Sequence, residues 1–336
     1  MPHVCIIAEA GVNHNGSLDL ALRLVDAAKA SGADAVKFQT FRADLLATRS
    51  ARKAPYQERT TANAESQFEM LQRLELDAAA HQRLIAHCRE IGIQFLSSPF
   101  DAASADFLAT LNVPLFKVPS GEITNLPFLR HLAGKGRPLI LSTGMSTLGE
   151  VEEAVRELKA AGATEITLLH CVTEYPTPYD QVNLRAMQTL KAAFGLPVGH
   201  SDHTPGIEIA VAAAALGAEV IEKHFTLDRS LPGPDHAASL EPEELGQMVA
   251  AIRHVEAALG NGVKAPAPCE LANLRIARKS VVAARSLQAG HQLVLEDLEI
   301  KRPGSGIAPK MLPAFIGRTL RVSLAKDEII KWDHLA

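Results

Sequence analysis

Two motifs in this sequence place a histidine directly after a short apolar run. They are residues 199–206 (GHSDHTPG) and residues 222–225 (EKHF), and the Ala-rich segment 207–216 between them predicts a helix. Histidines at the ends of two strands joined by one helix can face one cavity, where neutral imidazoles bind a divalent metal. The alternative is that each is an ordinary hydrogen-bonded histidine.

Two lysines and several small polar residues indicate a site for an anion. Lys37 and Lys117 could place ammonium groups around one ligand, and segments 120–121 (SG) and 142–144 (STG), with Ser201, add hydroxyls and backbone amides. These groups suit a phosphate, or a phosphate together with a carboxylate. No P-loop is present.

Two carboxylates lie close to these segments in the sequence. Glu9 and Glu122 could transfer protons if they are partly removed from water. They could equally be salt-bridge partners of the two lysines. Both interpretations can hold together, because a neighbouring ammonium keeps a carboxylate ionised.

A repeated strand-then-helix pattern must position these residues. Short apolar runs lie at 4–9, 35–39, 94–97, 115–118, 139–142, 165–170, 197–200 and 219–223, and each is followed by a helical pattern. Eight such units predict a closed (β/α)₈ TIM barrel. A doubly wound open sheet is the alternative, but no GxGxxG turn follows any of these runs.

Polar and aromatic residues cluster at the carboxyl ends of the predicted strands. A barrel opens all these ends on one rim, where catalytic residues lie. The residues at this rim are Glu9, Lys37, Gln39, Ser98, Phe100, Lys117, Ser120, Glu122, Ser142, Thr143, Tyr175, Ser201, Asp202, His203, His224 and Asp235.

The connection 40–77 is far longer than a usual strand-to-helix loop. Its position on the catalytic face predicts a lid or a substrate wall. Disorder is the alternative, although residues 68–71 (FEML) predict at least one packed helical turn.

Composition limits the classes of partner. The chain has 336 residues and a formal net charge of -4, which gives no general attraction to nucleic acid or to an anionic membrane. Its cysteines are scattered without a CxxC pair, and we expect reduced thiols. A strand-like run begins almost at Met1, and no apolar run is long enough to span a bilayer. We therefore expect a cytoplasmic protein.

The character of the sequence changes near residue 260. Residues 261–268 (NGVKAPAP) predict a linker, and short β-branched runs follow at 280–284 and 319–323. We predict a catalytic barrel at 1–262, a linker at 263–278 and a small β-rich domain at 279–336. So small a module should pack against the barrel or against another subunit.

These motifs together resemble the sialic acid synthase family over nearly the whole chain. Members condense phosphoenolpyruvate with an N-acetylmannosamine-type sugar and water, giving a nine-carbon 2-keto acid and phosphate. The tail, with residues 301–306 (KRPGSG), resembles the antifreeze-like SAF domain that is fused to those barrels. The matching segments are 8–16, 36–40, 97–101, 116–122, 141–145, 169–176, 199–204, 222–226 and 232–236.

The resemblance implies a role for each matched residue. A divalent metal, Mn²⁺ or else Mg²⁺ or Co²⁺, would be bound by His203 and His224. Glu122 would deprotonate the water that adds to phosphoenolpyruvate. The groups around phosphoenolpyruvate would be Lys37, Lys117, Ser98, Ser120, Ser142 and Ser201. The sugar would contact Glu9, Gln39, Phe100, Glu122, Tyr175 and Asp235. Arg302 would come from the partner subunit of a domain-swapped homodimer.

The sequence departs from the family pattern at two positions. Ser98 stands where some members have Thr, and Thr173 stands where some have Asn. In the long connection, Asn63 and Gln67 are the candidates for an additional sugar contact.

Segments 172–176 and 235–239 resemble members that make legionaminic acid from 2,4-diacetamido-2,4,6-trideoxymannose, although related sequences accept N-acetylmannosamine. Two other functions stay open at this point. One is a pyruvate aldolase that forms a Schiff base on Lys117 or Lys37, and the other is a sugar-binding protein without activity.

Overall fold

The computed structural model describes residues 3–61 and 65–336. It divides into two compact units, residues 1–260 and residues 261–336. The division into barrel, linker and β-rich domain at 262/263 and 278/279 stays a prediction.

The first unit is a (β/α)₈ barrel, as predicted, and not a doubly wound sheet. Eight parallel strands follow the order β3-β2-β1-β8-β7-β6-β5-β4, and β3 lies beside β4, which closes the ring. The strands are β1 (Cys5–Gly11), β2 (Ala35–Thr40), β3 (Gln94–Pro99), β4 (Phe116–Val118), β5 (Leu139–Ser142), β6 (Ile166–Cys171), β7 (Val198–Asp202) and β8 (Val220–His224).

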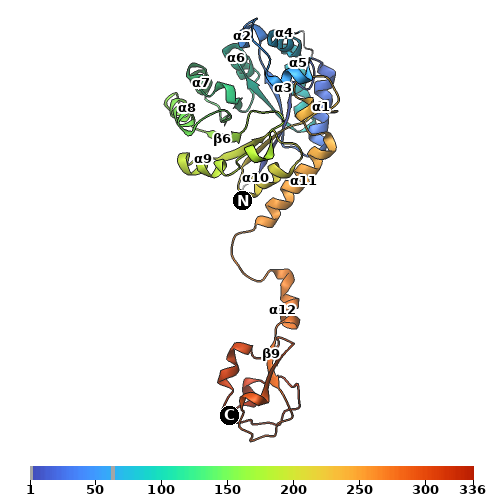
Figure 1. Ribbon diagram of the computed structural model, residues 1–336, viewed down its shortest axis with the longest axis vertical. Helices are drawn as coiled ribbons and strands as arrows, with labels where there is room; N and C mark the ends of the chain where they lie inside the picture. Colours follow the sequence, from blue (N-terminus) through green and yellow to red (C-terminus); the bar gives the residue numbers. More distant parts are fainter. Residues whose placement is uncertain (1–2, 62–64) are drawn as a thin grey trace. The chain divides into compact units, whose positions relative to one another are not determined.

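Helices surround these strands (Figure 1). The helices that follow the strands are α1 (Leu18–Ala30), α5 (Ala78–Ile91), α6 (Ala102–Thr110), α7 (Leu126–Ala133), α8 (Leu148–Ala160), α9 (Ala186–Phe194), α10 (Glu208–Ala215) and α11 (Pro242–Leu259). Side-chain caps fix several of their starts. Ser17 accepts a hydrogen bond from the backbone of Leu20 at α1, and Thr147 forms a capping box with Glu150 at α8. Within the described residues, no helix is both long and apolar enough to cross a membrane.

Side chains alternate between the outside and the inside of the barrel along each strand, and they form two separate apolar clusters. Side chains that point outward, such as Ile6, Val36 and Phe116, pack against the helices. The inward set at the amino-terminal end of the strands forms a second cluster, called the apolar layer from here on. Its members are Ile7, Ala35, Leu96, Ile140, Leu169 and Val220. This layer fills one end of the barrel, so the next inward positions face the other end.

Gly199 shows how closely the apolar layer packs. A Cβ atom at this position would lie 2.3 Å from the carbonyl oxygen of Val220 and 2.7 Å from Cδ2 of Leu169. No other residue type could occupy this inward position of β7 without moving its neighbours.

The connection after β2 forms three helices, α2 (Ala43–Leu46), α3 (Pro55–Thr60) and α4 (Gln67–Leu74). Met70 and Leu74 of α4 are buried against Val12 and Phe41. The packed helical turn predicted at 68–71 is therefore confirmed, because apolar side chains of α4 attach this segment to the rim.

The second unit has its own small core and an antiparallel pair of strands. It contains α12 (Leu271–Ala277), β9 (Ser280–Ala283) and β10 (Leu298–Lys301), with short 3-10 turns between them. Val281, Phe315 and Ile330 lie in its core. The run at 280–284 forms β9 as expected, whereas Thr319 and Leu320 of the second run take part only in isolated bridges.

Candidate active site

A cavity of about 340 Å³ opens at the carboxyl ends of the barrel strands. Most of the predicted site residues line it. These are Glu9, Lys37, Gln39, Ser98, Phe100, Lys117, Ser120, Ser142, Tyr175, Ser201, His203, His224 and Asp235. The long connection contributes Tyr56, Gln57, Gln67 and Met70. The lid or wall predicted for this segment is thus part of the cavity.

The alternation that builds the apolar layer also builds this site. Glu9, Lys37 and Glu222 are the next inward residues after Ile7, Ala35 and Val220. Strand register sets their neighbours, since Glu9 is paired with Lys37 on one side and with His224 on the other. The apolar layer therefore becomes the floor of the cavity.

Four ionisable side chains form a buried network above this floor, called the charged layer from here on. Nζ of Lys37 lies 2.7 Å from Oε2 of Glu9 and 3.7 Å from Oε2 of Glu222. Nζ of Lys117 lies 3.0 Å from Oε1 of Glu222. All four side chains are almost completely buried. The two lysines are thus brought together as predicted, with a glutamate between them.

Burial and ion pairing shift the pKa values of these side chains in different directions. Burial raises the pKa of Glu9. Burial opposes ionisation of Glu222 too, but Lys117 and Lys37 outweigh it and lower the pKa of Glu222 to about 2. Burial also disfavours the Lys37 ammonium, yet Glu222 and Glu9 together raise the pKa of Lys37. Glu222 is therefore a carboxylate and Lys37 an ammonium near neutral pH.

Glu222 is the site residue that the sequence prediction missed. It belongs to the EKHF motif, but it received no role. Glu222 lies two residues before His224, and residues 222 and 224 of one strand point to the same face. This spacing could have identified it.

The serines differ in how far their hydroxyls are already satisfied. Ser98 accepts a hydrogen bond from Lys37 (3.1 Å), and Ser201 donates one to Glu222 (2.9 Å). Ser120 accepts one from the backbone of Gly144 (3.0 Å). The Ser142 hydroxyl is buried and has no hydrogen-bond partner in the described part of the chain. It is free for a ligand.

The two histidines lie side by side at one side of the cavity, with ring centroids 5.4 Å apart. Nδ1 of His203 donates to the carbonyl of Val172 (2.6 Å), so its Nε2 has the lone pair. The neighbour of this nitrogen is the Ser201 hydroxyl at 3.5 Å, which donates instead to Glu222. Burial lowers the pKa of His203 to about 4; burial, with His203 as neighbour, also lowers that of His224. Nδ1 of His224 is buried without a hydrogen bond among the described residues. Two neutral imidazoles with free nitrogens fit a divalent metal.

The described residues contain no group of three or more histidine, cysteine or acidic side chains placed to bind a metal. A metal here would have the two imidazoles as protein ligands, and its other positions would be left for water or substrate.

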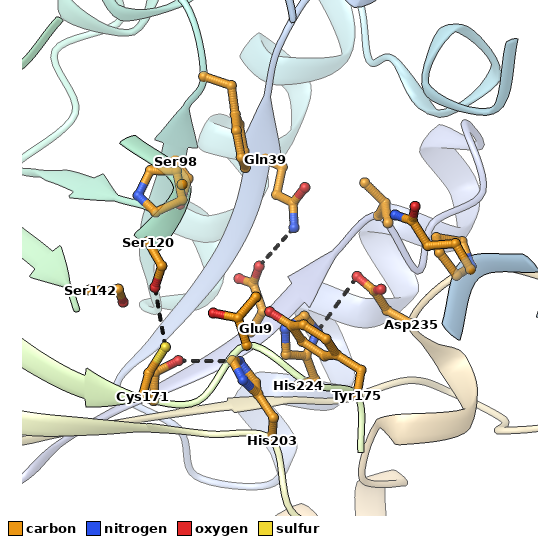
Figure 2. A pocket seen from close by; sticks show the side chains of 18 of the residues that line it. Glu9, Gln39, Ser98, Ser120, Ser142, Cys171, Tyr175, His203, His224 and Asp235 are labelled. Carbon is orange, nitrogen blue, oxygen red and sulfur yellow. Dashed lines mark hydrogen bonds and ion pairs between the residues drawn. The ribbon is translucent and has the colours of Figure 1, made fainter. Parts of the chain in front are cut away.

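Aromatic rings cover the histidines. Tyr175 lies over His203 at 4.2 Å between centroids, and Tyr56 of α3 lies against Tyr175 at 4.9 Å. Oδ2 of Asp235 is 3.8 Å from Nδ1 of His224, and burial, together with the charge of Glu9, raises the pKa of Asp235 to about 7. Figure 2 shows Tyr175, His203, His224 and Asp235 on one side of the cavity and the three serines Ser98, Ser120 and Ser142 on the other.

Three residues expected at the rim do not line the cavity, namely Glu122, Thr143 and Asp202, and Asp202 points to the outward face of β7. Glu122 lies on the short turn η1 (Ser120–Glu122), half-buried, and accepts a hydrogen bond from Asn125 (2.7 Å). Arg302 belongs to the second unit, where its Nε donates to the carbonyl of Ala277 (3.1 Å). Of the two candidates in the long connection, Gln67 lines the cavity, and Asn63 lies outside the described residues.

The fold and the site define a TIM barrel with a cavity at one rim, in which paired lysines and several serines face two neutral histidines. Comparison with known proteins makes this more specific. The NeuB family model matches residues 24–264 and the SAF domain model matches residues 278–336. The chain belongs to the NeuB family.

The similarity to known proteins extends over nearly the full chain. The chain is 52% identical to the N,N'-diacetyllegionaminic acid synthase of Campylobacter jejuni, over 98% of this chain and 100% of that one. It is 49% identical to the enzyme of the same name from Legionella pneumophila, over 98% of this chain and 94% of that one. A solved N-acetylneuraminic acid (sialic acid) synthetase from Leptospira borgpetersenii is similar with a TM-score of 0.71 and 37% identity, over 82% of this chain and 90% of that one.

Proposed function

We propose that this enzyme condenses phosphoenolpyruvate with 2,4-diacetamido-2,4,6-trideoxymannose and water, giving N,N'-diacetyllegionaminate and phosphate. The observation that supports the chemistry is the single cavity in which the charged layer and the serines face two neutral histidines. The choice of acceptor sugar is supported by the identity to the two legionaminic acid synthases.

The serine side of the cavity suits phosphoenolpyruvate. Lys37 and Lys117 would face its carboxylate and phosphate, with Ser98, Ser120 and Ser142 as hydrogen-bond donors. Ser201 would donate to the ligand only by giving up its hydrogen bond to Glu222. Because Glu9 and Glu222 already pair with the lysines, the ammonium groups are held in place before the ligand arrives. Such preorganised charges stabilise the anionic groups through the reaction.

The histidine side suits the sugar. His203 and His224 would hold a divalent metal, Mn²⁺ being the first choice, and this ion would act as a Lewis acid on the aldehyde of the open-chain sugar. Gln39, Phe100, Tyr175 and Asp235 would orient the sugar beside it. The aldehyde carbon would then face C3 of phosphoenolpyruvate, and a new carbon–carbon bond would form between the two sides of the cavity.

Water must then add at C2 of phosphoenolpyruvate, and phosphate leaves with cleavage of the C–O bond. We assign the acceptance of the water proton to Glu122. Burial raises the pKa of this carboxyl, which suits a proton acceptor. Glu122 directly follows the Ser120–Gly121 part of the cavity wall but does not line the cavity itself, so the assignment requires its carboxylate to leave Asn125 and turn to the substrate. Glu122→Gln should lower kcat much more than it changes the KM for phosphoenolpyruvate.

A Schiff-base aldolase is less well supported by this geometry. The raised pKa of Lys37 keeps it an ammonium, which cannot attack a carbonyl, and Lys117 is paired with Glu222. The two mechanisms separate on simple reagents. We expect EDTA to abolish turnover, Mn²⁺ to restore it, and borohydride with pyruvate to leave the enzyme active.

The acceptor is tested by comparing kcat/KM for 2,4-diacetamido-2,4,6-trideoxymannose and for N-acetylmannosamine, each with phosphoenolpyruvate. The diacetamido sugar should be the better substrate. Equal values would contradict the proposed acceptor but not the condensation itself.

We also propose a domain-swapped homodimer in which Arg302 reaches the partner's site. An Arg302→Ala chain and a His203→Ala chain should each be inactive. Mixing them and allowing subunits to exchange should restore part of the activity, because one site of a heterodimer then has both native residues. No recovery on mixing would place Arg302 outside the partner's site.

A further inference from the structure

The structure contains a second buried ion pair close to the histidines but on the opposite face of the same strands. Nζ of Lys223 lies 2.7 Å from Oδ2 of Asp202, and both side chains are fully buried. The two residues are direct partners in the register between β7 and β8. Each immediately precedes one of the histidines, His203 and His224.

This pair also fixes the turn that follows β7. Oδ1 of Asp202 accepts hydrogen bonds from the backbone N–H (2.9 Å) and the hydroxyl (2.8 Å) of Thr204. Nζ of Lys223 donates to the carbonyl of Thr204 (2.6 Å). His203 therefore lies between two residues that one ion pair holds in place.

Stability alone does not explain an ion pair at this position. Many outward strand positions are apolar, as Ile6, Val36 and Phe116 illustrate. The buried polar residues Thr40, Ser97, His170 and His200 on this face are uncharged side chains or histidines rather than ion pairs. Replacing a buried ion pair by well-packed apolar residues is often neutral or stabilising, because two charges lose their hydration on burial. An apolar pair, however, could not bind the N–H, hydroxyl and carbonyl groups of Thr204.

The loop after β6 makes two further hydrogen bonds to His203. Its Nδ1 donates to Val172, and its carbonyl accepts from the backbone of Thr177 (2.9 Å). The loop after β6 therefore orients the imidazole, whereas Asp202 and Lys223 set the position of the backbone that bears it.

We infer that Asp202, Lys223 and Thr204 form a positioning clamp that sets the separation of His203 and His224 for a shared divalent cation. This inference rests on the metal site in the proposed function. Partners outside the ligands typically contribute about 10–100-fold to the affinity for a metal. The clamp should have an effect in this range although none of its three side chains need touch the ion.

The test uses the full-length protein and Mn²⁺ alone, titrated by electron paramagnetic resonance. The informative variant is Asp202→Leu with Lys223→Met, which removes both charges together and leaves neither one buried without its partner. We expect it to fold but to unfold at a lower temperature, because buried Thr204 loses three hydrogen bonds. It should also bind Mn²⁺ about 10–100-fold more weakly. Asp202→Asn combined with Lys223→Met, which keeps the acceptor for Thr204 and leaves no buried charge unpaired, should recover most of the affinity.

Arg253→Met is the matched control. It breaks a partly exposed ion pair of the same length, in which Nη2 of Arg253 lies 2.7 Å from Oδ2 of Asp34, next to the start of β1. It should lower stability without changing the affinity for Mn²⁺. If the double variant binds Mn²⁺ as tightly as the wild type, the pair is only structural and the clamp is wrong.

A measurement without metal separates this inference from the proposed function. If the wild type binds no Mn²⁺, the proposed metal site fails. The clamp is then judged from imidazole ¹⁵N shifts of metal-free protein. The His203 and His224 signals should be sharp in the wild type and shifted or broadened in the double variant, because the backbone that bears His203 is no longer held. Identical signals would overturn it.

Discussion

The apolar layer and the charged layer lie next to each other inside the barrel, on neighbouring inward positions of the same strands. Ile7 and Glu9 of β1 illustrate the change from one layer to the other. Burying an apolar side chain contributes about 1.5–3 kcal/mol to stability. Burying a charged pair contributes little, because desolvation offsets most of the attraction. The charged layer is therefore better explained by binding than by stability.

The difference between apolar and charged side chains also decides how each layer responds to a ligand. The apolar layer has no free polar atoms, and it closes the floor against water. In the charged layer, the Lys37 ammonium already faces Glu9, Glu222 and Ser98, so an anion would meet preformed donors. Four predictions test this contrast, in order of decreasing effect.

Lys37→Met, a change in the charged layer, should have the largest effect on activity. Methionine keeps the length of the side chain but removes the ammonium from both glutamates. We expect kcat/KM for phosphoenolpyruvate to fall by about 10²–10³-fold, the loss typical of one preorganised donor. Lys191→Met, at a surface lysine paired with Glu219, is the control and should be fully active. A Lys37→Met enzyme with near-normal kcat/KM would mean that the charged layer does not bind the anion.

Acid should remove the contribution of Glu222 to the charged layer and leave the apolar layer unaffected, whereas Glu9, whose pKa is raised, contributes with the opposite sign. The pKa of Glu222 is lowered from 4.5 to about 2 in the folded protein. The unfolded chain therefore takes up a proton that the folded chain refuses, and the stabilising contribution of Glu222 is lost as pH falls from about 4.5 to about 2. Denaturant unfolding of metal-free protein across this range should show the loss, and Glu222→Gln should reduce the slope. Equal slopes would place Glu222 outside the ion pairs.

Ile140→Val removes one methylene from the apolar layer. We expect a loss of about 0.5–1.5 kcal/mol in the free energy of unfolding, because the cavity left behind is only partly refilled. The loss should be the same at every pH, and kcat of the folded enzyme should not change. A marked fall in kcat would show that the floor and the charged layer are mechanically coupled.

Ser142→Ala should have the smallest effect. The hydroxyl is buried without a hydrogen-bond partner in the described chain, so its removal should not lower stability. If it donates to phosphoenolpyruvate, the loss of one hydrogen bond of about 0.5–1.5 kcal/mol should raise KM roughly 2- to 12-fold. Ser146→Ala, whose hydroxyl donates to the Gly144 carbonyl, is a nearby control. An unchanged KM would exclude Ser142 from the anion site.

The sequence by itself determined the repeating strand-helix units and most of the cavity lining. Both follow from local patterns. Apolar runs predict buried strands, and the carboxyl ends of barrel strands meet at one rim, so Lys37, Lys117, His203 and His224 could be expected to face one space. The motifs themselves were sufficient to indicate the family.

Only the tertiary structure decided the partners of these residues. That Glu222 lies between two lysines from β2 and β4, and that Asp202 meets Lys223 behind the histidines, depends on barrel closure and on the register between strands. The pKa values of Glu222 and His203 depend on the same closure, because burial and neighbouring charges exist only after distant segments come together. Contacts between segments far apart in the chain leave no local pattern, and that is why the sequence could name most residues of this site but neither Glu222 nor the pairs that it and Asp202 form.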